Sequence, residues 1–155
     1  MKSDILSPSD LQSLVVGKKV LIDTNVIIYL TDRVQPYEEL SRLLFALIEE
    51  GKVEGVLSVV SVAEVIYGPL KKGLVEITSK IREYLLNFPN ISCQMIDLET
   101  LEQIGIDRRI NWPKLRTVDA LIIASGLKAN VDKIVSNDLH FRKAVSKTFL
   151  VSFDL

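Results

Sequence analysis

The stretch KVLIDTNVIIYL at residues 19–30 determines how the rest of the chain is interpreted. Its first part, KVLID, is too short for a buried helix. It is also apolar without alternation, as is typical of a strand covered on both faces. An aspartate then interrupts the apolar sequence before VII continues it. We therefore predict a buried strand over Lys19–Asp23, with the charged side chain at its carboxyl end.

Four further runs of this kind follow along the chain, and helical patterns lie between them. The other predicted strands are Gly55–Val59, Cys93–Ile96, Lys133–Ser136 and Thr148–Ser152. The predicted helices are Tyr37–Glu50, Ser61–Tyr67, Val75–Asn87, Leu98–Ile110 and Val118–Lys128. This alternation indicates a three-layer α/β/α fold with a mainly parallel, five-stranded sheet. In such folds ligands bind beyond the carboxyl ends of the strands.

Length and composition indicate one domain over residues 1–155. The chain is 48% apolar and 25% charged, with seven glycines and five prolines, which excludes disordered, collagen-like and low-complexity proteins. The longest unbroken apolar stretch, Leu43 to Ile48, is far shorter than the ~20 residues that a membrane-spanning helix needs. Asp4 stands where a secretion signal would begin its apolar region. We therefore expect a cytoplasmic protein that is not associated with a membrane.

The charge balance and the rare residue types narrow the possible chemistry. Nineteen basic and twenty acidic residues give a net charge of -1, so any nucleic-acid binding must be local. Cys93 is the only cysteine and His140 the only histidine. Disulfides, zinc fingers and metal sites with two histidines are therefore excluded. The glycine-rich phosphate-binding loops of nucleotide-dependent enzymes are also absent from the sequence.

Four acidic residues fall at or near the predicted junctions between strands and helices, and each has a purely structural explanation. Asp23 can cap the short helix that follows it. Ser61 and Glu64 fit a capping box, in which two side chains bond the first turn of a helix. Asp119 lies near the positive end of a predicted helix, and Asp138 in Ser-Asn-Asp fits ordinary turn chemistry. Taken singly, none of the four indicates a functional site.

Taken together, the surroundings of these residues favour a metal site. Asp23, Glu64 and Asp119 interrupt apolar sequence, so we expect them to be at least partly buried, which is costly without a charge partner. No lysine or arginine lies within those apolar segments. Two carboxylates ~5 Å apart repel by about 3 kcal/mol at an effective dielectric constant of ~20. A converging all-oxygen set, without histidine or cysteine, predicts Mg²⁺ or Mn²⁺ rather than zinc.

Four motifs, in this order, resemble the PIN-domain family, and in particular its small VapC-type toxin-like members. The motifs are Asp-Thr-Asn at 23–25, SVAEVIYG at 61–68, VDALIIA at 118–124 and SNDLHF at 136–141. The likeness runs over roughly residues 19–151. It implies a Rossmann-like three-layer fold and a metal-dependent ribonuclease that hydrolyses RNA phosphodiester bonds.

Carried onto this chain, the resemblance implies a catalytic and metal-binding quartet of Asp23, Glu64, Asp119 and Asp138. Asp23 and Asp119 are then expected to bind Mg²⁺ or Mn²⁺ directly. Glu64 and Asp138 are expected to hold metal-bound waters or a second ion, and one of them would help to deprotonate the attacking water.

Three further positions enter through the same resemblance. Asn25 is expected to support the site by hydrogen bonding near Asp23. Ser136 is expected to replace the small hydroxyl residue that precedes the last acid. His140 departs from the family pattern, because many relatives have a second acid at that position, and the sequence gives it no role.

A basic segment before Asp119 is the candidate substrate surface. Arg109, Lys114 and Arg116 are expected to hold RNA phosphates, and Trp112 has the side chain to stack on an unpaired base. The alternative is that Arg108 and Arg109 belong to a solvated helix end and that Trp112 packs in the core.

The expected partners follow mainly from the resemblance: an RNA substrate, a small antitoxin protein and a second copy of the chain. The amphipathic helices around Leu40–Ile48 and Leu74–Leu86 can supply a dimer face, although core packing explains them equally well. The competing functional hypothesis is a catalytically degenerate PIN-fold module that binds RNA or protein.

Overall fold

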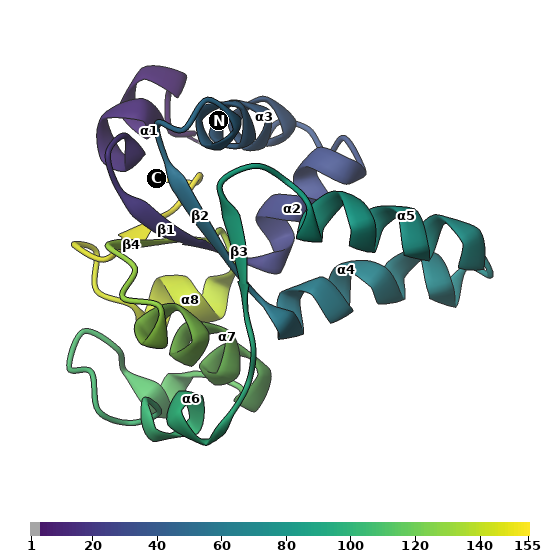
Figure 1. Cartoon of the computed structure of the whole chain (residues 1–155). Helices are drawn as coiled ribbons and strands as arrows, with labels where there is room; N and C mark the ends of the chain where they lie inside the picture. Colours follow the sequence, from purple (N-terminus) through teal and green to yellow (C-terminus); the bar gives the residue numbers. More distant parts are fainter. Residues whose placement is uncertain (1–3) are drawn as a thin grey trace.

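The computed structural model describes residues 4–155 and contains a five-stranded parallel sheet (Figure 1). Its strands run in the spatial order β3-β2-β1-β4-β5, and all four neighbouring pairs are parallel. Their bounds are Lys19–Ile22 (β1), Glu54–Ser58 (β2), Ile91–Gln94 (β3), Lys133–Val135 (β4) and Leu150–Val151 (β5). The predicted five-stranded parallel sheet is therefore confirmed.

Helices connect the strands and cover both faces of the sheet. They are α1 (Pro8–Val15), α2 (Thr24–Thr31), α3 (Glu38–Glu49), α4 (Val59–Lys71), α5 (Val75–Leu86), α6 (Leu98–Glu102), α7 (Thr117–Lys128) and α8 (Leu139–Ala144). A short 3-10 helix, η1, spans Trp112–Lys114. Figure 1 shows α1 and α3 on one side of the sheet and α6, α7 and α8 on the other. This is the predicted three-layer arrangement.

The strand sequences produce two hydrophobic cores because consecutive side chains point to opposite faces of a strand. In β1, Val20 and Ile22 belong to the core beneath α1, α2 and α3, whereas Leu21 belongs to the core beneath α7. Gly126 lets α7 approach closely, because a Cβ atom there would lie 2.8 Å from Cδ2 of Leu21. This packing fixes α7, and with it the first turn that carries Asp119.

Some predicted bounds are wrong for identifiable reasons. The helix predicted over Leu98–Ile110 is only α6, because Gly105 takes a left-handed φ of 90°. Asp107 also accepts a hydrogen bond from the backbone N–H of Arg109 at 2.9 Å, which competes with helix formation. The sequence analysis did not predict α1, although Ser7 caps it and Pro8 begins it.

No helix among residues 4–155 is long and apolar enough to cross a membrane. Residues 1–3, which begin the stretch used to argue against a secretion signal, lie outside the described residues. The single domain over residues 1–155 therefore stays a prediction, although every described strand belongs to one sheet.

Candidate active site

The four predicted acidic residues come together at the carboxyl edge of the sheet. Asp23 follows β1, Asp138 lies three residues after β4, Glu64 lies on the helix that follows β2, and Asp119 lies in the first turn of α7. Short contacts connect all four through three intervening side chains, which are Thr24, Ser136 and Arg116. The predicted convergence at this edge is therefore present in the fold.

Asp23 is a buried carboxylate that is only 5% exposed. Its Oδ1 accepts a hydrogen bond from the backbone N–H of Thr24 at 2.8 Å, so it does cap α2. Its Oδ2 accepts a hydrogen bond from the hydroxyl of Ser136 at 2.6 Å. Burial nevertheless raises the pKa of Asp23 from 3.8 to about 7, with smaller contributions from the charges of Asp138 and Glu64. Capping and site membership therefore coexist at this residue.

Glu64 reaches the site through Thr24, whose hydroxyl donates to Glu64 Oε1 at 2.6 Å. The residue is exposed, so the expectation that it would be partly buried is wrong. The capping-box explanation is wrong as well, because α4 begins two residues before Ser61 and its N-cap is Ser58. Ser58 Oγ accepts from the backbone N–H of Val60 at 3.2 Å. This leaves the Glu64 carboxylate without a structural role in starting the helix.

Asp119 is the other buried carboxylate, at 3% exposure, and it has a charge partner that the sequence analysis did not assign to it. Arg116 donates to it with Nε at 2.8 Å and Nη2 at 3.0 Å. The backbone N–H of Arg116, the N-cap residue of α7, also donates to Asp119 Oδ2 at 3.3 Å. Arg116 Nη2 also lies 3.7 Å from Asp138 Oδ2, so one guanidinium faces two of the four acids.

Asp138 begins α8 as its N-cap, which corrects its interpretation as an ordinary turn residue. Its Oδ1 accepts from the backbone N–H groups of His140 at 2.8 Å and Phe141 at 3.3 Å. Its own backbone N–H donates to Ser136 Oγ at 3.1 Å. Ser136 therefore links Asp138 to Asp23, and its supporting role in the site stays a prediction.

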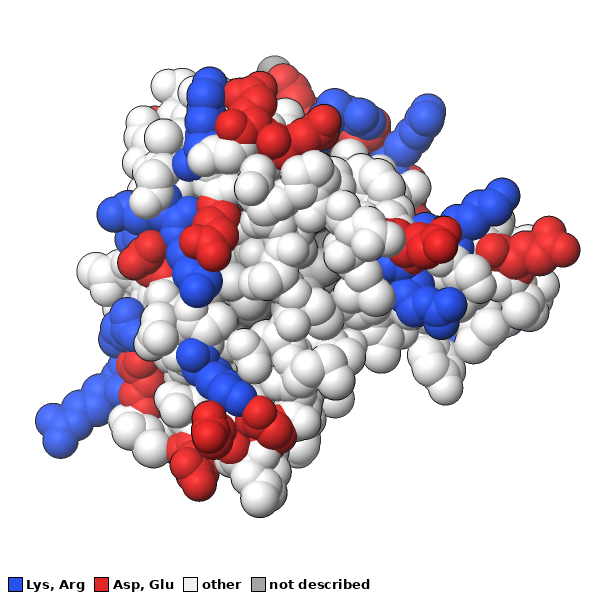
Figure 2. All heavy atoms as spheres, in the orientation of Figure 1, with Lys and Arg blue, Asp and Glu red and all other residues white. Residues whose placement is uncertain are grey.

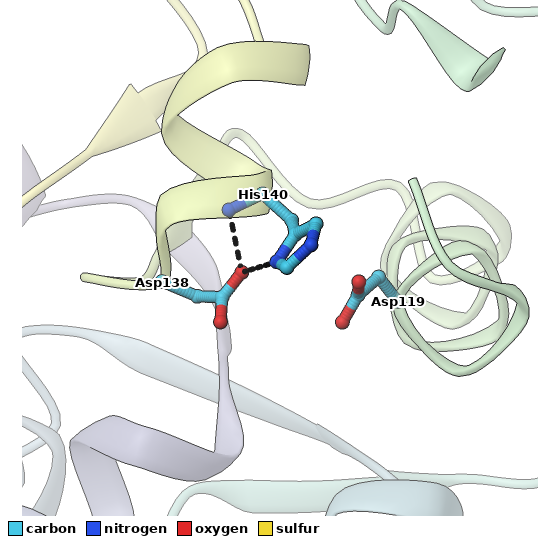
Figure 3. Close-up of side chains that lie close together, drawn as sticks. All are labelled: Asp119, Asp138 and His140. Atoms are coloured by element: carbon cyan, nitrogen blue, oxygen red, sulfur yellow. Dashed lines mark hydrogen bonds and ion pairs between the residues drawn. The ribbon is translucent and has the colours of Figure 1, made fainter. Parts of the chain in front are cut away.

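Three of these side chains form a compact set of potential metal ligands, and one of them is a histidine. Ligand atoms of Asp119, Asp138 and His140 all lie within 4.8 Å of one another. Figure 3 shows the imidazole of His140 between the two carboxylates. The set suits a divalent cation, and it differs from the predicted set of carboxylates by including a ring nitrogen. Asn25 adds a buried Oδ1 that accepts no hydrogen bond from the described residues.

The comparison with known families now decides the identity of the fold. The family model described as the PIN domain matches residues 20–147, a span that contains all four acidic residues. The chain belongs to the PIN-domain family. The resemblance that was predicted from the four sequence motifs is therefore confirmed.

Several solved structures share the fold of this PIN domain. VapBC2 from Rickettsia felis, bound to a DNA fragment from its promoter, has a TM-score of 0.62 at 18% identity, covering 88% of this chain and 99% of that one. VapC20 from Mycobacterium tuberculosis, a toxin that cleaves the sarcin–ricin loop, has a TM-score of 0.59 at 15% identity, with coverages of 80% and 93%. FitAcB from Neisseria gonorrhoeae has a TM-score of 0.55 at 23% identity, with coverages of 77% and 87%. No curated protein matches the chain by sequence.

The basic segment of the PIN domain divides into residues with different surroundings. Arg109 is held by Asp107, with Nε–Oδ1 and Nη2–Oδ2 distances of 3.0 and 2.7 Å, and its guanidinium lies 3.7 Å from the centre of the Phe149 ring. Lys114 is exposed at the end of η1. Trp112 is half-buried against the core beneath α7, and its indole N–H donates to the carbonyl of Asp107. RNA binding by Arg109 and Lys114 stays a prediction.

Two residues of the site had signals that the sequence analysis did not use. Arg116 and Asp119 are spaced i, i+3 across a helix start, the spacing at which side chains meet. His140 lies two residues after Asp138, the N-cap of α8. It therefore belongs to the first turn of a helix that begins at the same edge of the sheet. Thr24 had no such signal, because its contact with Glu64 joins residues 40 positions apart.

Proposed function

We propose that this PIN domain is a metal-dependent endoribonuclease and the toxin of a toxin–antitoxin pair. The observation that carries the proposal is the meeting of four acidic residues, from four separate segments, at the ligand-binding edge of a parallel sheet. Clustered carboxylates repel one another and attract divalent cations and the phosphates that such cations bind. VapC20, which shares the fold, cleaves the sarcin–ricin loop of RNA.

The cation would be Mg²⁺ or Mn²⁺, held by Asp119 and Asp23 with Asp138 beside them. Both oxygens of Asp23 accept one hydrogen bond each, and a carboxylate oxygen has a second lone pair for a further ligand. When bound, the cation makes its water more acidic and neutralises charge that builds on the phosphate. Asp23 and Asp119 are both buried, so an ion held by both would be largely shielded from solvent.

Glu64 is the best-placed proton acceptor for the attacking water. It is exposed, and Thr24 fixes it through Oε1. Its Oε2 accepts no hydrogen bond from the described residues, so that oxygen is available to a water molecule. As the water oxygen attacks phosphorus, its proton passes to Glu64, the bond from phosphorus to the leaving sugar oxygen breaks, and that oxygen takes a proton from solvent.

Arg116 donates hydrogen bonds to both carboxylate oxygens of the buried Asp119. A cation that binds both Asp119 oxygens competes with the guanidinium, because the same lone pairs cannot serve both. The Arg116 side chain is 59% exposed, so it has room to turn toward solvent. Once turned outward, it is placed to hold an RNA phosphate beside the acids, which is the role predicted for it.

A groove beside Glu64 is the proposed seat of a small antitoxin. It lies between α2 and the hairpin formed by α4 and α5, and Ile28, Val65, Leu74 and Ile77 are among its lining residues. An apolar protein segment in this groove would cover Glu64, which also lines it. A toxin–antitoxin complex from Klebsiella pneumoniae shares the fold of this chain, with a TM-score of 0.58 at 18% identity, which supports an antitoxin partner here.

The exposed side of α5 is the proposed homodimer face. Figure 1 shows α4 and α5 projecting from the sheet as a hairpin, and within α5 only Leu85 is buried. Core packing therefore explains the apolar residues of α3, but it does not explain Val75, Tyr84 and Leu86 of α5, which are exposed. Figure 2 shows charged side chains around the rim of the face that carries β3 and few across its middle. Both partners fit a cytoplasmic protein, as expected from the sequence.

The test is cleavage of a panel of structured and unstructured RNAs with Mn²⁺ or Mg²⁺. We expect the wild type to cut at least one RNA, Asp119→Asn to lose cutting, and the matched variant Asp10→Asn to retain it. Asp10 is exposed on α1 and belongs to no part of the site. Equal cleavage by wild type and Asp119→Asn would refute the proposal. Binding of the metal without cleavage of any RNA would favour the degenerate binding module instead.

A further inference from the structure

His140 is the one member of the ligand cluster to which neither the sequence analysis nor the proposed nuclease chemistry gives a role. Its side chain is 45% exposed, so a cation can reach the imidazole from solvent. Its Nδ1 lies 3.4 Å from Asp138 Oδ1, and neither ring nitrogen makes a hydrogen bond with the described residues. The imidazole therefore lies at the acidic edge with Nε2 available and with Nδ1 in contact only with the carboxylate of Asp138 (Figure 3).

The fold holds this imidazole in place through α8. Asp138 Oδ1 binds the backbone N–H groups of His140 and Phe141, and Phe141 is fully buried in the core beneath α7. These contacts fix the first turn of α8, so the direction of the His140 side chain is set by backbone anchoring. The other oxygen of Asp138 lies 3.7 Å from Arg116 Nη2. Asp138 thus positions His140 and remains available as a ligand.

The spacing of the three side chains fits one metal ion. Bonds of about 2.1 Å hold neighbouring ligand atoms about 3–4 Å apart around a cation. The ligand atoms of Asp119, Asp138 and His140 lie within 4.8 Å of one another, so small side-chain rotations bring them to that separation. Two carboxylates and one imidazole form a mixed oxygen and nitrogen set, which favours first-row transition ions over Mg²⁺.

We propose that His140 is a nitrogen ligand of the metal and makes the site selective for Mn²⁺ and similar transition ions over Mg²⁺. The inference rests on the proposed function, because it assumes that the acidic edge binds a metal. It adds a preference for transition ions, which a site made of the four acids alone does not have. The measured ratio of Mn²⁺ to Mg²⁺ affinity should exceed that of a variant with oxygen ligands only, His140→Asp, by about tenfold.

The decisive experiment is electron paramagnetic resonance of Mn²⁺ bound to the full chain. Because His140 is the only histidine, any imidazole nitrogen coupled to the Mn²⁺ spin must come from it. We expect nitrogen-14 modulation of the spin echo in the wild type. The modulation should change to the nitrogen-15 pattern when the protein is made with nitrogen-15 histidine, and it should vanish in His140→Gln. The isotope arm leaves the sequence unchanged, so a folding defect cannot imitate the result.

The outcomes separate this inference from the proposed function. If Mn²⁺ binds and the nitrogen modulation appears and follows the isotope, His140 is a ligand. If Mn²⁺ binds, as judged by loss of the spectrum of the free ion, but no histidine nitrogen is coupled, the inference is wrong while the metal site stands. If Mn²⁺ does not bind to the wild type at all, both the inference and the metal-dependent function are overturned.

Discussion

Asp23 and Asp119 are both almost fully buried at the same edge of the sheet, yet the chain stabilises them in different ways. Asp23, at the end of β1, has neutral hydrogen-bond donors, and burial raises its pKa to about 7. Asp119, at the start of α7, has the cation Arg116 on both of its oxygens. Burial therefore favours the protonated, neutral form of Asp23, whereas the charge of Asp119 is balanced by the cation Arg116.

The difference shows how a strongly acidic site is kept in a stable fold before a metal binds. Four ionised carboxylates at one edge would repel one another by several kcal/mol. The raised pKa of Asp23 and the ion pair of Asp119 both reduce that repulsion. A bound metal ion would reduce the repulsion in place of these two effects. Each of the two effects can be removed separately by mutation, at Asp23 and at Arg116.

The largest expected effect is on the pH dependence of stability without metal. The pKa of Asp23 rises from 3.8 to about 7 on folding, so between these values the folded state binds more protons than the unfolded state. Stability must then fall as pH rises from about 4 to about 7, by up to about 4 kcal/mol for this one group. Asn at this position can still cap α2, so Asp23→Asn should lack this loss.

Urea unfolding of both proteins from pH 4 to pH 8, with a metal chelator present, measures this effect. Asp23→Asn should be the more stable protein at pH 7.5, and the two curves should converge near pH 4. Parallel curves would mean that Asp23 is ionised in the folded protein over the whole range, and the contrast with Asp119 would disappear.

The second prediction concerns the cation at the α7 end. Arg116→Gln removes the group that competes for the Asp119 oxygens, so Mn²⁺ should bind about tenfold more tightly, a change of about 1.4 kcal/mol. RNA binding should weaken in the same variant and depend less on salt. Arg109→Gln is the matched control for the Mn²⁺ affinity, because Asp107 and Phe149 hold that arginine. Isothermal titration calorimetry of the three proteins decides the point, and equal Mn²⁺ affinities would contradict the competition.

The smallest expected effect is at Ser136, which joins the two ends. Ser136→Ala removes the 2.6 Å hydrogen bond to Asp23 and the bond from the backbone of Asp138. It should destabilise the metal-free protein by about 1 kcal/mol at pH 7.5. It should also raise the pKa of Asp23 further, because the serine bond favours the ionised form. Ser146→Ala, on the exposed turn before β5, should change neither quantity in the same unfolding assay.

The sequence was sufficient for the sheet, the family and the convergence of the acids. Short apolar runs can form parallel strands only if helices cover both faces, and parallel strands end at one edge, so Asp23 and Asp138 had to meet there. The order of four motifs then indicated the family, which the match over residues 20–147 confirmed. The site roles of the individual residues stay predictions.

The sequence was insufficient where side-chain direction or local competition decides the outcome. The ion pair between Arg116 and Asp119 depends on how the chain enters α7. Glu64 is exposed on α4, and that helix starts earlier than the capping pattern indicated. The long helix predicted through Gly105 failed because its backbone adopts a left-handed conformation there. The place of His140 in the cluster follows from the anchoring of α8 by Asp138, which a turn interpretation of Asp138 had hidden.

The central claim is that the acids of both ends form one metal site. Its most direct test is to measure Mn²⁺ binding to the wild type and to Asp119→Asn at pH 7.5. Calorimetry gives the affinity, and thermal unfolding gives the stabilisation. We predict that Mn²⁺ binds the wild type and stabilises it by about 2.7 kcal/mol at a concentration of ~100 times the dissociation constant. Asp119→Asn should bind at least about tenfold more weakly and lose most of that gain. Equal binding by the two proteins, or no binding by the wild type, would contradict the claim.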